Sequence, residues 1–175
     1  MSKETGYRVG VIGAGAIAQA CHLPGYAKCN STTIVAFADP AQDRHAEVVD
    51  KYPGAKGYTV WRDMLNSENL DVVSVCVPSK LLAKASQDAL EAGCHVLCEK
   101  PMAVTMPEAD ALVETARRKR KKLMVAFSHR FMSGPRKCKE LLDAKELGKP
   151  FELRIRFGSS GPYPGWARDP ETFYS

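Results

Sequence analysis

Residues 7–18 read YRVGVIGAGAIA, and this stretch decides the fold. Residues 7–13 form an apolar run typical of a buried strand, and a helical pattern over residues 16–29 follows at once. We expect Gly13 to allow the tight turn between them and Gly15 to let the backbone approach a phosphate. Ala18 is small enough for the helix to pack against the strand. The stretch therefore predicts a strand, a phosphate-binding turn and a helix.

The same alternation continues along the chain. Further strand-like runs and helical segments follow one another, the strands over residues 33–39, 57–61, 72–78, 95–99 and 123–127, and the helices over residues 40–52, 62–70, 81–93 and 106–121. Near-continuous apolar strands between amphipathic helices predict a parallel sheet covered on both faces. Pro24 lacks a backbone donor and predicts a kink or restart in the first helix. We therefore expect a doubly wound α/β (Rossmann) domain over residues 1–128.

The composition changes after about residue 127. Residues 151–157, FELRIRF, alternate apolar and polar side chains, which is typical of an antiparallel strand with one solvated face. Residues 158–175 are loop-like and reach no closing element. We expect residues 129–175 to form a connecting helix and the first strand of a truncated C-terminal α+β domain.

Composition and cysteine usage narrow the class of protein. The chain has 175 residues, of which 45% are hydrophobic and 26% charged, as in ordinary globular proteins. No apolar run approaches the roughly 18 residues of a membrane span, and no secretion leader is visible, so we expect a cytoplasmic protein with no membrane partner. No C-x-x-C spacing occurs among the six cysteines, and Cys21 and His22 are adjacent, which suits two ligands of one ion poorly. We expect buried, reduced thiols and no metal site.

The net charge of +5 has one main source, the RRKRKK run at residues 117–122. Such a run is compatible with a nucleic-acid patch. It also suits a solvated helix C-terminus, where cations complement the helix dipole. No aromatic residues interleave the run, so we favour the helix terminus and expect no nucleic-acid partner.

Asp39 ends the second strand, 24 residues after Gly15. This spacing suits a carboxylate that accepts hydrogen bonds from ribose hydroxyls of a bound dinucleotide. A 2′-phosphate would meet like charge there, which favours NAD over NADP, although the nearby Arg44 softens this preference. We expect the affinity for NADH to be at least about tenfold higher than the affinity for NADPH.

Residues 95–105, HVLCEKPMAVT, end a buried strand with Glu99, Lys100 and Pro101. A surface ion pair between Glu99 and Lys100 is the plain interpretation, and it would stabilise the protein by under about 1 kcal/mol. Beside a dinucleotide site, we favour a functional role for the pair. We also expect a cis Lys100–Pro101 peptide bond.

These motifs, together with the segments SHRF and ELGKPFELRIRF, resemble those of the Gfo/Idh/MocA family of nicotinamide-dependent sugar and cyclitol oxidoreductases. The resemblance implies that Lys100 lies beside the nicotinamide, positions the substrate hydroxyl and assists proton transfer. Trp166 and Arg168 resemble residues that reach back toward the cofactor. The cofactor-binding residues implied by motif and resemblance are Gly13, Gly15, Ala16, Ile17, Asp39, Val77, Pro78, Glu99, Lys100 and Arg168.

The sequence departs from the family pattern in two respects. Val77 replaces a usual threonine and Leu82 replaces a usual histidine near the nicotinamide, so a polar contact is lost. The chain also ends before the Asp-x-x-x-His motif that carries the catalytic histidine of the family's second domain. His129 and Arg130 of the SHRF segment are either site contacts or structural residues.

The resemblance implies a nicotinamide-dependent oxidoreductase acting on a sugar or polyol, of which this chain is a dinucleotide-binding fragment. We expect NAD as cofactor and a homo-oligomeric full-length protein. Two alternatives remain open: a non-catalytic NAD-binding regulatory module, and a glycosidase that uses NAD without net redox change.

Overall fold

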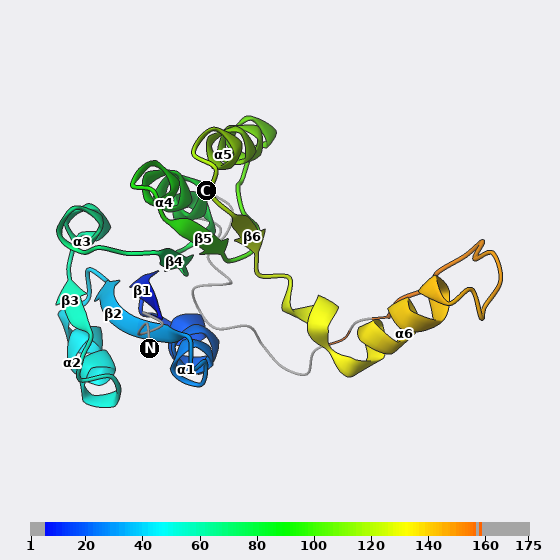
Figure 1. The fold of residues 1–175 in the computed structure, drawn as a ribbon, viewed down its shortest axis with the longest axis horizontal. Coiled ribbons are helices and arrows are strands. Elements are labelled where there is room, and N and C mark those ends of the chain that lie inside the picture. The colour runs from blue at the N-terminus through cyan, green and yellow to red at the C-terminus, as the bar shows by residue number, and fades with distance from the viewer. Residues whose placement is uncertain (1–5, 157, 159–175) are drawn as a thin grey trace, which may run out of the picture.

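A computed structural model describes residues 6–156 and Gly158 (Figure 1). Its centre is a six-stranded parallel sheet in the order β3-β2-β1-β4-β5-β6. The strands are β1 (Tyr7–Ile12), β2 (Thr32–Ala38), β3 (Lys56–Tyr58), β4 (Val72–Val75), β5 (His95–Cys98) and β6 (Leu123–Val125). The chain builds the sheet outward from β1 in one direction and then, from β4, in the other. This order confirms the doubly wound α/β sheet expected from the sequence.

Helices cover both faces of this sheet (Figure 1). On one face lie η1 (Ala18–His22), α1 (Leu23–Ala27) and α2 (Gln42–Lys51), and on the other lie α3 (Trp61–Ser67), α4 (Ser79–Glu91) and α5 (Met106–Arg118). Each layer has its own apolar cluster: Leu23 and Val48 belong to the first, and Leu82 and Leu112 to the second. The inner strands β1, β2 and β4 are largely buried between these layers, which explains their near-continuous apolar sequence.

The first helix restarts at Pro24, as expected from the sequence. Residues 16–27 are helical, but residues 18–22 form a π-turn, η1, and regular α-helix begins at Leu23 with Pro24 in its first turn. Pro24 has no N–H to donate, and the π-turn before it, in which the Leu23 N–H donates to the Ala18 carbonyl, already interrupts the regular helical hydrogen-bond pattern at this point. The π-turn sets which side chains of the segment face the sheet.

Several element boundaries differ by a few residues from those expected, and two of them show why. The third strand ends at Tyr58, and Trp61 begins α3, where its indole N–H donates to Asp88 Oδ2 over 3.0 Å. Helix α5 ends at Arg118, because Arg120 adopts a left-handed φ of 55°. These ends depend on tertiary contacts and local backbone geometry that hydrophobic periodicity does not report.

The basic run lies at the C-terminal end of α5 and the turn after it. Arg118 forms an ion pair with Glu91 Oε1, and Lys119 Nζ lies 3.0 Å from Glu91 Oε2 and donates to the Glu91 carbonyl over 2.8 Å. Two cations of the run are therefore engaged with the end of α4. This arrangement is that of a charged helix terminus.

The chain leaves the sheet after β6. The 3₁₀-turn η2 (Ser128–Phe131) and α6 (Ser133–Asp143) follow, and α6 extends away from the sheet with no buried residue (Figure 1). The strand expected at residues 151–157 is wrong for the described residues 151–156, which belong to no strand. Phe151, Leu153 and Ile155 are 97%, 77% and 78% exposed. A strand requires a neighbour for its backbone hydrogen bonds, and no described segment pairs with this one.

All six cysteines are free, but the expectation that they are buried holds for only three of them. Cys76, Cys94 and Cys98 are buried, whereas the other three are exposed. Among the helices of the described chain, none combines the length and apolar character that a membrane span requires.

Candidate functional site

The carboxyl ends of β1, β2, β4 and β5 meet at one edge of the sheet. The segments after these strands carry Gly13, Asp39, Val77 and Glu99 in that order. The sheet reverses its order between β1 and β4, and open α/β sheets bind ligands in the crevice outside such a switch point. Residues predicted separately from the sequence therefore lie along one edge.

Gly13 makes the turn after β1 against the backbone of Cys76, the residue that follows β4. Its φ is +88°, and its N–H donates to the Ala38 carbonyl over 2.8 Å. A Cβ added at Gly13 would lie 2.6 Å from the Cys76 carbonyl oxygen, so only glycine fits. Gly15 differs, because the nearest atom to an added Cβ is Arg44 Nη1 at 3.9 Å. One glycine therefore closes the turn, and the other leaves an open side.

The helix after this turn presents its N-terminus at the same edge. The side chains of Ala16 and Ile17 are exposed, while Ala18 is fully buried against the sheet. The first N–H groups of a helix have no intrahelical acceptor and lie at the positive end of its dipole. Together with the open side of Gly15, they form a cradle suited to a pyrophosphate.

Asp39 is buried, with 2% of its surface exposed, and it organises the adjacent turn. Its Oδ2 accepts from Ala14 N over 2.8 Å, and its Oδ1 accepts from Ala41 N over 2.9 Å. Arg44 Nη1 lies 3.0 Å from Oδ2 and 3.3 Å from Oδ1. The carboxylate thus holds the phosphate turn while the half-exposed guanidinium covers it.

Glu99 and Lys100 follow β5 directly. Glu99 N–H donates to the Val75 carbonyl over 2.9 Å, and the Lys100 N–H donates to Glu99 Oε2 over 3.1 Å. The Lys100–Pro101 peptide bond is cis, which confirms the expectation from sequence. The Glu99 side chain is only 14% exposed, whereas Lys100 is exposed. The turn thus anchors its carboxylate inward and leaves the lysine at the surface.

Burial of Glu99 acts to raise the pKa of its carboxyl group, but hydrogen bonds oppose that effect. The His22 ring and the Lys100 backbone N–H both donate to the carboxylate, and the positive charge of Lys100 adds to the effect. Together they outweigh burial and lower the pKa of Glu99 below its ordinary value. Glu99 is therefore ionised at neutral pH.

His22 is a site residue that the sequence interpretation missed. Its Nε2 lies 3.1 Å from Glu99 Oε1, and its ring is 6% exposed. A signal was available: His22 follows the buried Ala18 by four positions, so it lies on the inward face of the helix. A histidine on a buried face requires polar partners.

Val77 and Leu82, the two departures from the family pattern, lie just after β4 and in the first turn of α4. Val77 is half-buried near Gly13, and the exposed Pro78 immediately precedes α4. Leu82 is 1% exposed and belongs to the core cluster beneath α4. Its leucine side chain therefore serves packing.

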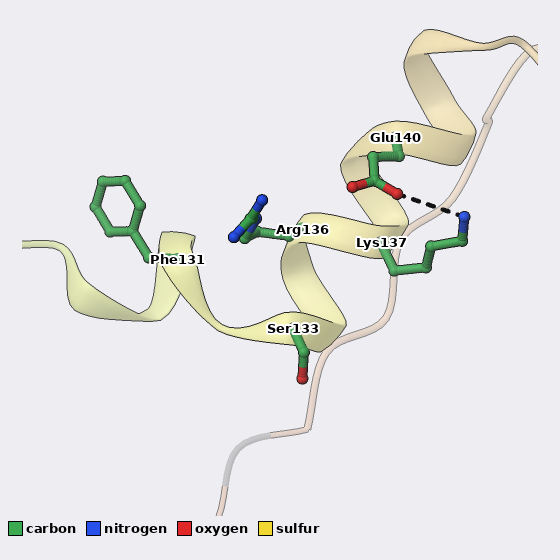
Figure 2. Close-up of a pocket in the computed structure, with 5 residues that line it drawn as sticks. All are labelled: Phe131, Ser133, Arg136, Lys137 and Glu140. Atoms are coloured by element: carbon green, nitrogen blue, oxygen red, sulfur yellow. Dashed lines mark hydrogen bonds and ion pairs between the residues drawn. The ribbon is translucent and has the colours of Figure 1, made fainter.

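The remaining candidates lie elsewhere. His129 and Arg130 are exposed on η2, and Arg168 and Trp166 fall outside the described residues. A pocket of about 350 Å³ lies at η2 and α6, which extend away from the sheet (Figure 1). Figure 2 shows the residues that line it, Phe131, Ser133, Arg136, Lys137 and Glu140, with an ion pair between the last two.

Within residues 6–156 and Gly158, no group of His, Cys, Asp and Glu side chains could hold a metal ion.

Comparison with known families gives one clear match. Residues 7–127, more than half of the chain, match the model of the Gfo/Idh/MocA oxidoreductases, described as an oxidoreductase family with an NAD-binding Rossmann fold. The matched region extends from β1 through β6 and includes the whole sheet edge.

Two curated relatives match almost the whole chain. The D-glucoside 3-dehydrogenase of Escherichia coli is 36% identical over 162 residues, covering 91% of this chain and 45% of the relative. The myo-inositol 2-dehydrogenase of Thermotoga maritima is 29% identical over 157 residues, covering 90% of this chain and 47% of the relative. The chain therefore spans about half the length of the curated relatives it matches.

Two solved structures that share the fold are more than a quarter identical to this chain in sequence. The WlbA dehydrogenase of Chromobacterium violaceum, in complex with NADH and UDP-GlcNAcA, superposes with a TM-score of 0.78 at 27% identity, covering 84% of this chain and 42% of that one. The 3-ketoreductase KijD10 of Actinomadura kijaniata, in complex with NADP and TDP-benzene, gives a TM-score of 0.73 at 32% identity, covering 79% and 42%. Related chains thus hold either dinucleotide.

Proposed function

The chain belongs to the Gfo/Idh/MocA oxidoreductase family, and from this premise we propose that it is the dinucleotide-binding part of a nicotinamide-dependent dehydrogenase. The proposed reaction is the reversible oxidation of a secondary hydroxyl of a sugar or cyclitol. One observation carries the proposal: the Gly13 turn, Asp39 and Lys100 lie along one sheet edge, on both sides of the switch point between β1 and β4.

The residues of the edge suit the successive parts of a dinucleotide. Asp39 follows β2 and would accept from the adenosine ribose, while Gly15, Ala16 and Ile17 would meet the pyrophosphate. Across the switch point, the nicotinamide end would lie near residues 77–78 and near Glu99 and Lys100. The fit is supported by the open side of Gly15 and by the exposed first turn of the helix.

Lys100 is the proposed catalytic residue. A bound nicotinamide supplies the hydride acceptor, and the role of Lys100 is to hold the substrate hydroxyl and assist removal of its proton. The exposed amine at the end of β5 can reach a substrate, while its backbone N–H is tied to Glu99. Arg168 is proposed as a further cofactor contact.

We propose NAD as the preferred cofactor because Asp39 would repel a 2′-phosphate. Asp39 and its Arg44 partner act in opposite directions, since the guanidinium lies 3.0 Å from the carboxylate and would attract the same phosphate. The carboxylate is buried in the turn, whereas Arg44 is a half-exposed side chain that can swing away. The fixed negative charge should therefore decide the preference.

The proposal extends to the whole protein. Residues 129–175 would begin a second domain that supplies the rest of the substrate pocket and the catalytic histidine, and the full-length protein would be a cytoplasmic homo-oligomer. On this basis the 175-residue chain should bind the dinucleotide but turn over little or no alcohol.

The proposal is tested by titrating the 175-residue chain with NADH and NADPH side by side. We expect the affinity for NADH to be at least about tenfold higher than that for NADPH. Asp39→Asn should weaken NADH binding by a similar factor. Asp43→Asn is the matched control. It removes the same charge, and Asp43 is exposed in the first turn of α2. Equal affinities for the two cofactors would refute the preference, and no binding of either would refute the proposed function.

A further inference from the structure

A buried chain of hydrogen bonds crosses the sheet beneath the proposed nicotinamide end. Tyr26 OH lies 3.4 Å from Ser74 Oγ, Ser74 Oγ lies 2.7 Å from His22 Nδ1, and His22 Nε2 lies 3.1 Å from Glu99 Oε1. The four residues come from α1, β4, η1 and the segment after β5. Ser74 is fully buried and His22 nearly so. This series of hydrogen bonds therefore connects α1, on one face of the sheet, to the turn at residues 99–101.

The donors in this series of hydrogen bonds all point toward Glu99. An ionised carboxylate can only accept, so His22 Nε2 carries a hydrogen. In the neutral ring, Nδ1 then accepts from the Ser74 hydroxyl, whose oxygen in turn accepts from Tyr26. Burial, only partly offset by the hydrogen bond to Ser74, raises the pKa of Tyr26, so its phenol remains a donor. Every hydroxyl and ring nitrogen in the chain has a partner in this one arrangement.

The π-turn determines which residue enters this arrangement. Residues 18–22 form η1, and His22 is its last residue, buried against β4. A π-turn shifts the side chains after it relative to a regular helix, and such turns often occur at functional sites. The segment thus aims an imidazole at a carboxylate 77 positions away in sequence.

We propose that His22 is a positioning residue for Lys100, acting through Glu99. The His22 ring holds one carboxylate oxygen, and the other oxygen accepts the Lys100 N–H over 3.1 Å. The lysine backbone is thereby tied to the sheet through His22. This inference rests on the proposed function, in which Lys100 lies at the nicotinamide end.

The test compares NADH with ADP-ribose, which lacks the nicotinamide. A loss of positioning at Lys100 affects only the nicotinamide half, whereas general damage to the fold weakens both ligands alike. Two variants separate the ring nitrogens: His22→Asn places an amide near the Nδ1 position only, and His22→Gln reaches the Nε2 position. His95→Asn is the matched control, because His95 lies on β5 and its Nδ1 accepts from Lys122 N over 2.9 Å.

We expect His22→Asn to weaken NADH binding about fivefold or more while ADP-ribose affinity changes less than about twofold. His22→Gln should restore most of the NADH affinity, and His95→Asn should change the affinity for neither NADH nor ADP-ribose. In a protein that already carries Glu99→Gln, the His22→Asn change should have little further effect, since glutamine has one acceptor oxygen and cannot bridge the His22 ring and the Lys100 N–H. If His22→Asn does not fold, His22→Ala, which removes both ring nitrogens, replaces it in the same comparison of NADH with ADP-ribose.

Equal losses for NADH and ADP-ribose, or equal losses in the two His22 variants, would overturn the positioning role alone. Binding of neither ligand by the unaltered chain is a different result. It would overturn the proposed function and this inference with it.

Discussion

Replacing Gly13 with alanine should separate backbone strain from collision at the phosphate turn. Gly13 has a φ of +88° and packs against Cys76, where an added Cβ would meet the carbonyl oxygen at 2.6 Å and the carbonyl carbon at 2.8 Å. Gly93 is a matched control, because its φ is +87° and no atom lies within 4 Å of an added Cβ. The two substitutions therefore share the conformational strain and differ in the collision.

The expected magnitudes follow from these two components. A left-handed conformation destabilises alanine by roughly 1–2 kcal/mol, and the loss of glycine's freedom in the unfolded chain offsets about 0.4–1 kcal/mol of this. Gly93→Ala should therefore lower the free energy of unfolding by about 1 kcal/mol. Gly13→Ala adds an overlap with backbone atoms that cannot rotate away, worth roughly 1–3 kcal/mol. Its total should be about 2–4 kcal/mol.

Urea unfolding followed by far-ultraviolet circular dichroism gives both free energies under one set of conditions. NADH titration of the folded variants adds a second comparison, since Gly93 lies at the opposite end of α4 from the proposed site. We expect Gly13→Ala to lose most NADH binding and Gly93→Ala to keep it. A Gly13 variant no less stable than the Gly93 variant would refute the close packing of the turn against Cys76.

Three further measurements test the structure around the site. Because the pKa of Glu99 is lowered in the folded chain from its usual 4.5, its ionised form stabilises the fold above that pH. The advantage of the unaltered chain over Glu99→Gln in urea unfolding should shrink as the pH falls through and below about 4.5, and a constant difference would contradict this. Leu82→Ala should lower the free energy of unfolding by about 2–5 kcal/mol, well beyond the half-buried control Leu81→Ala, and equal effects would place Leu82 outside the core. In thiol titration at about pH 8, Cys29 should react early, because hydrogen bonds from Ser31 lower its pKa, whereas burial raises the pKa of Cys98 to about 11. Three exposed cysteines should react before unfolding and three only after it, and fast reaction of Cys98 would count against the buried β5.

The local parts of the site were predictable because their signals lie in short stretches of sequence. The Gly13 turn, the helix after it and Asp39 at the end of β2 follow from spacing and hydrophobic periodicity. The short strand β3 and the end of α5 were placed less accurately, because side-chain contacts and a left-handed residue decide them. Residues 151–156 show the same limit, since an alternating pattern predicts a strand only where a neighbour pairs with it.

The sequence by itself determined the class of fold and the residue types available at the sheet edge, because periodicity and glycine placement act over a few neighbouring residues. Only the tertiary structure decided which of them meet. His22 and Glu99 are 77 positions apart, and their contact exists because the π-turn of η1 and the end of β5 pack on the same strand, β4. Contacts of this kind depend on the packing of whole elements, to which no single stretch of sequence corresponds.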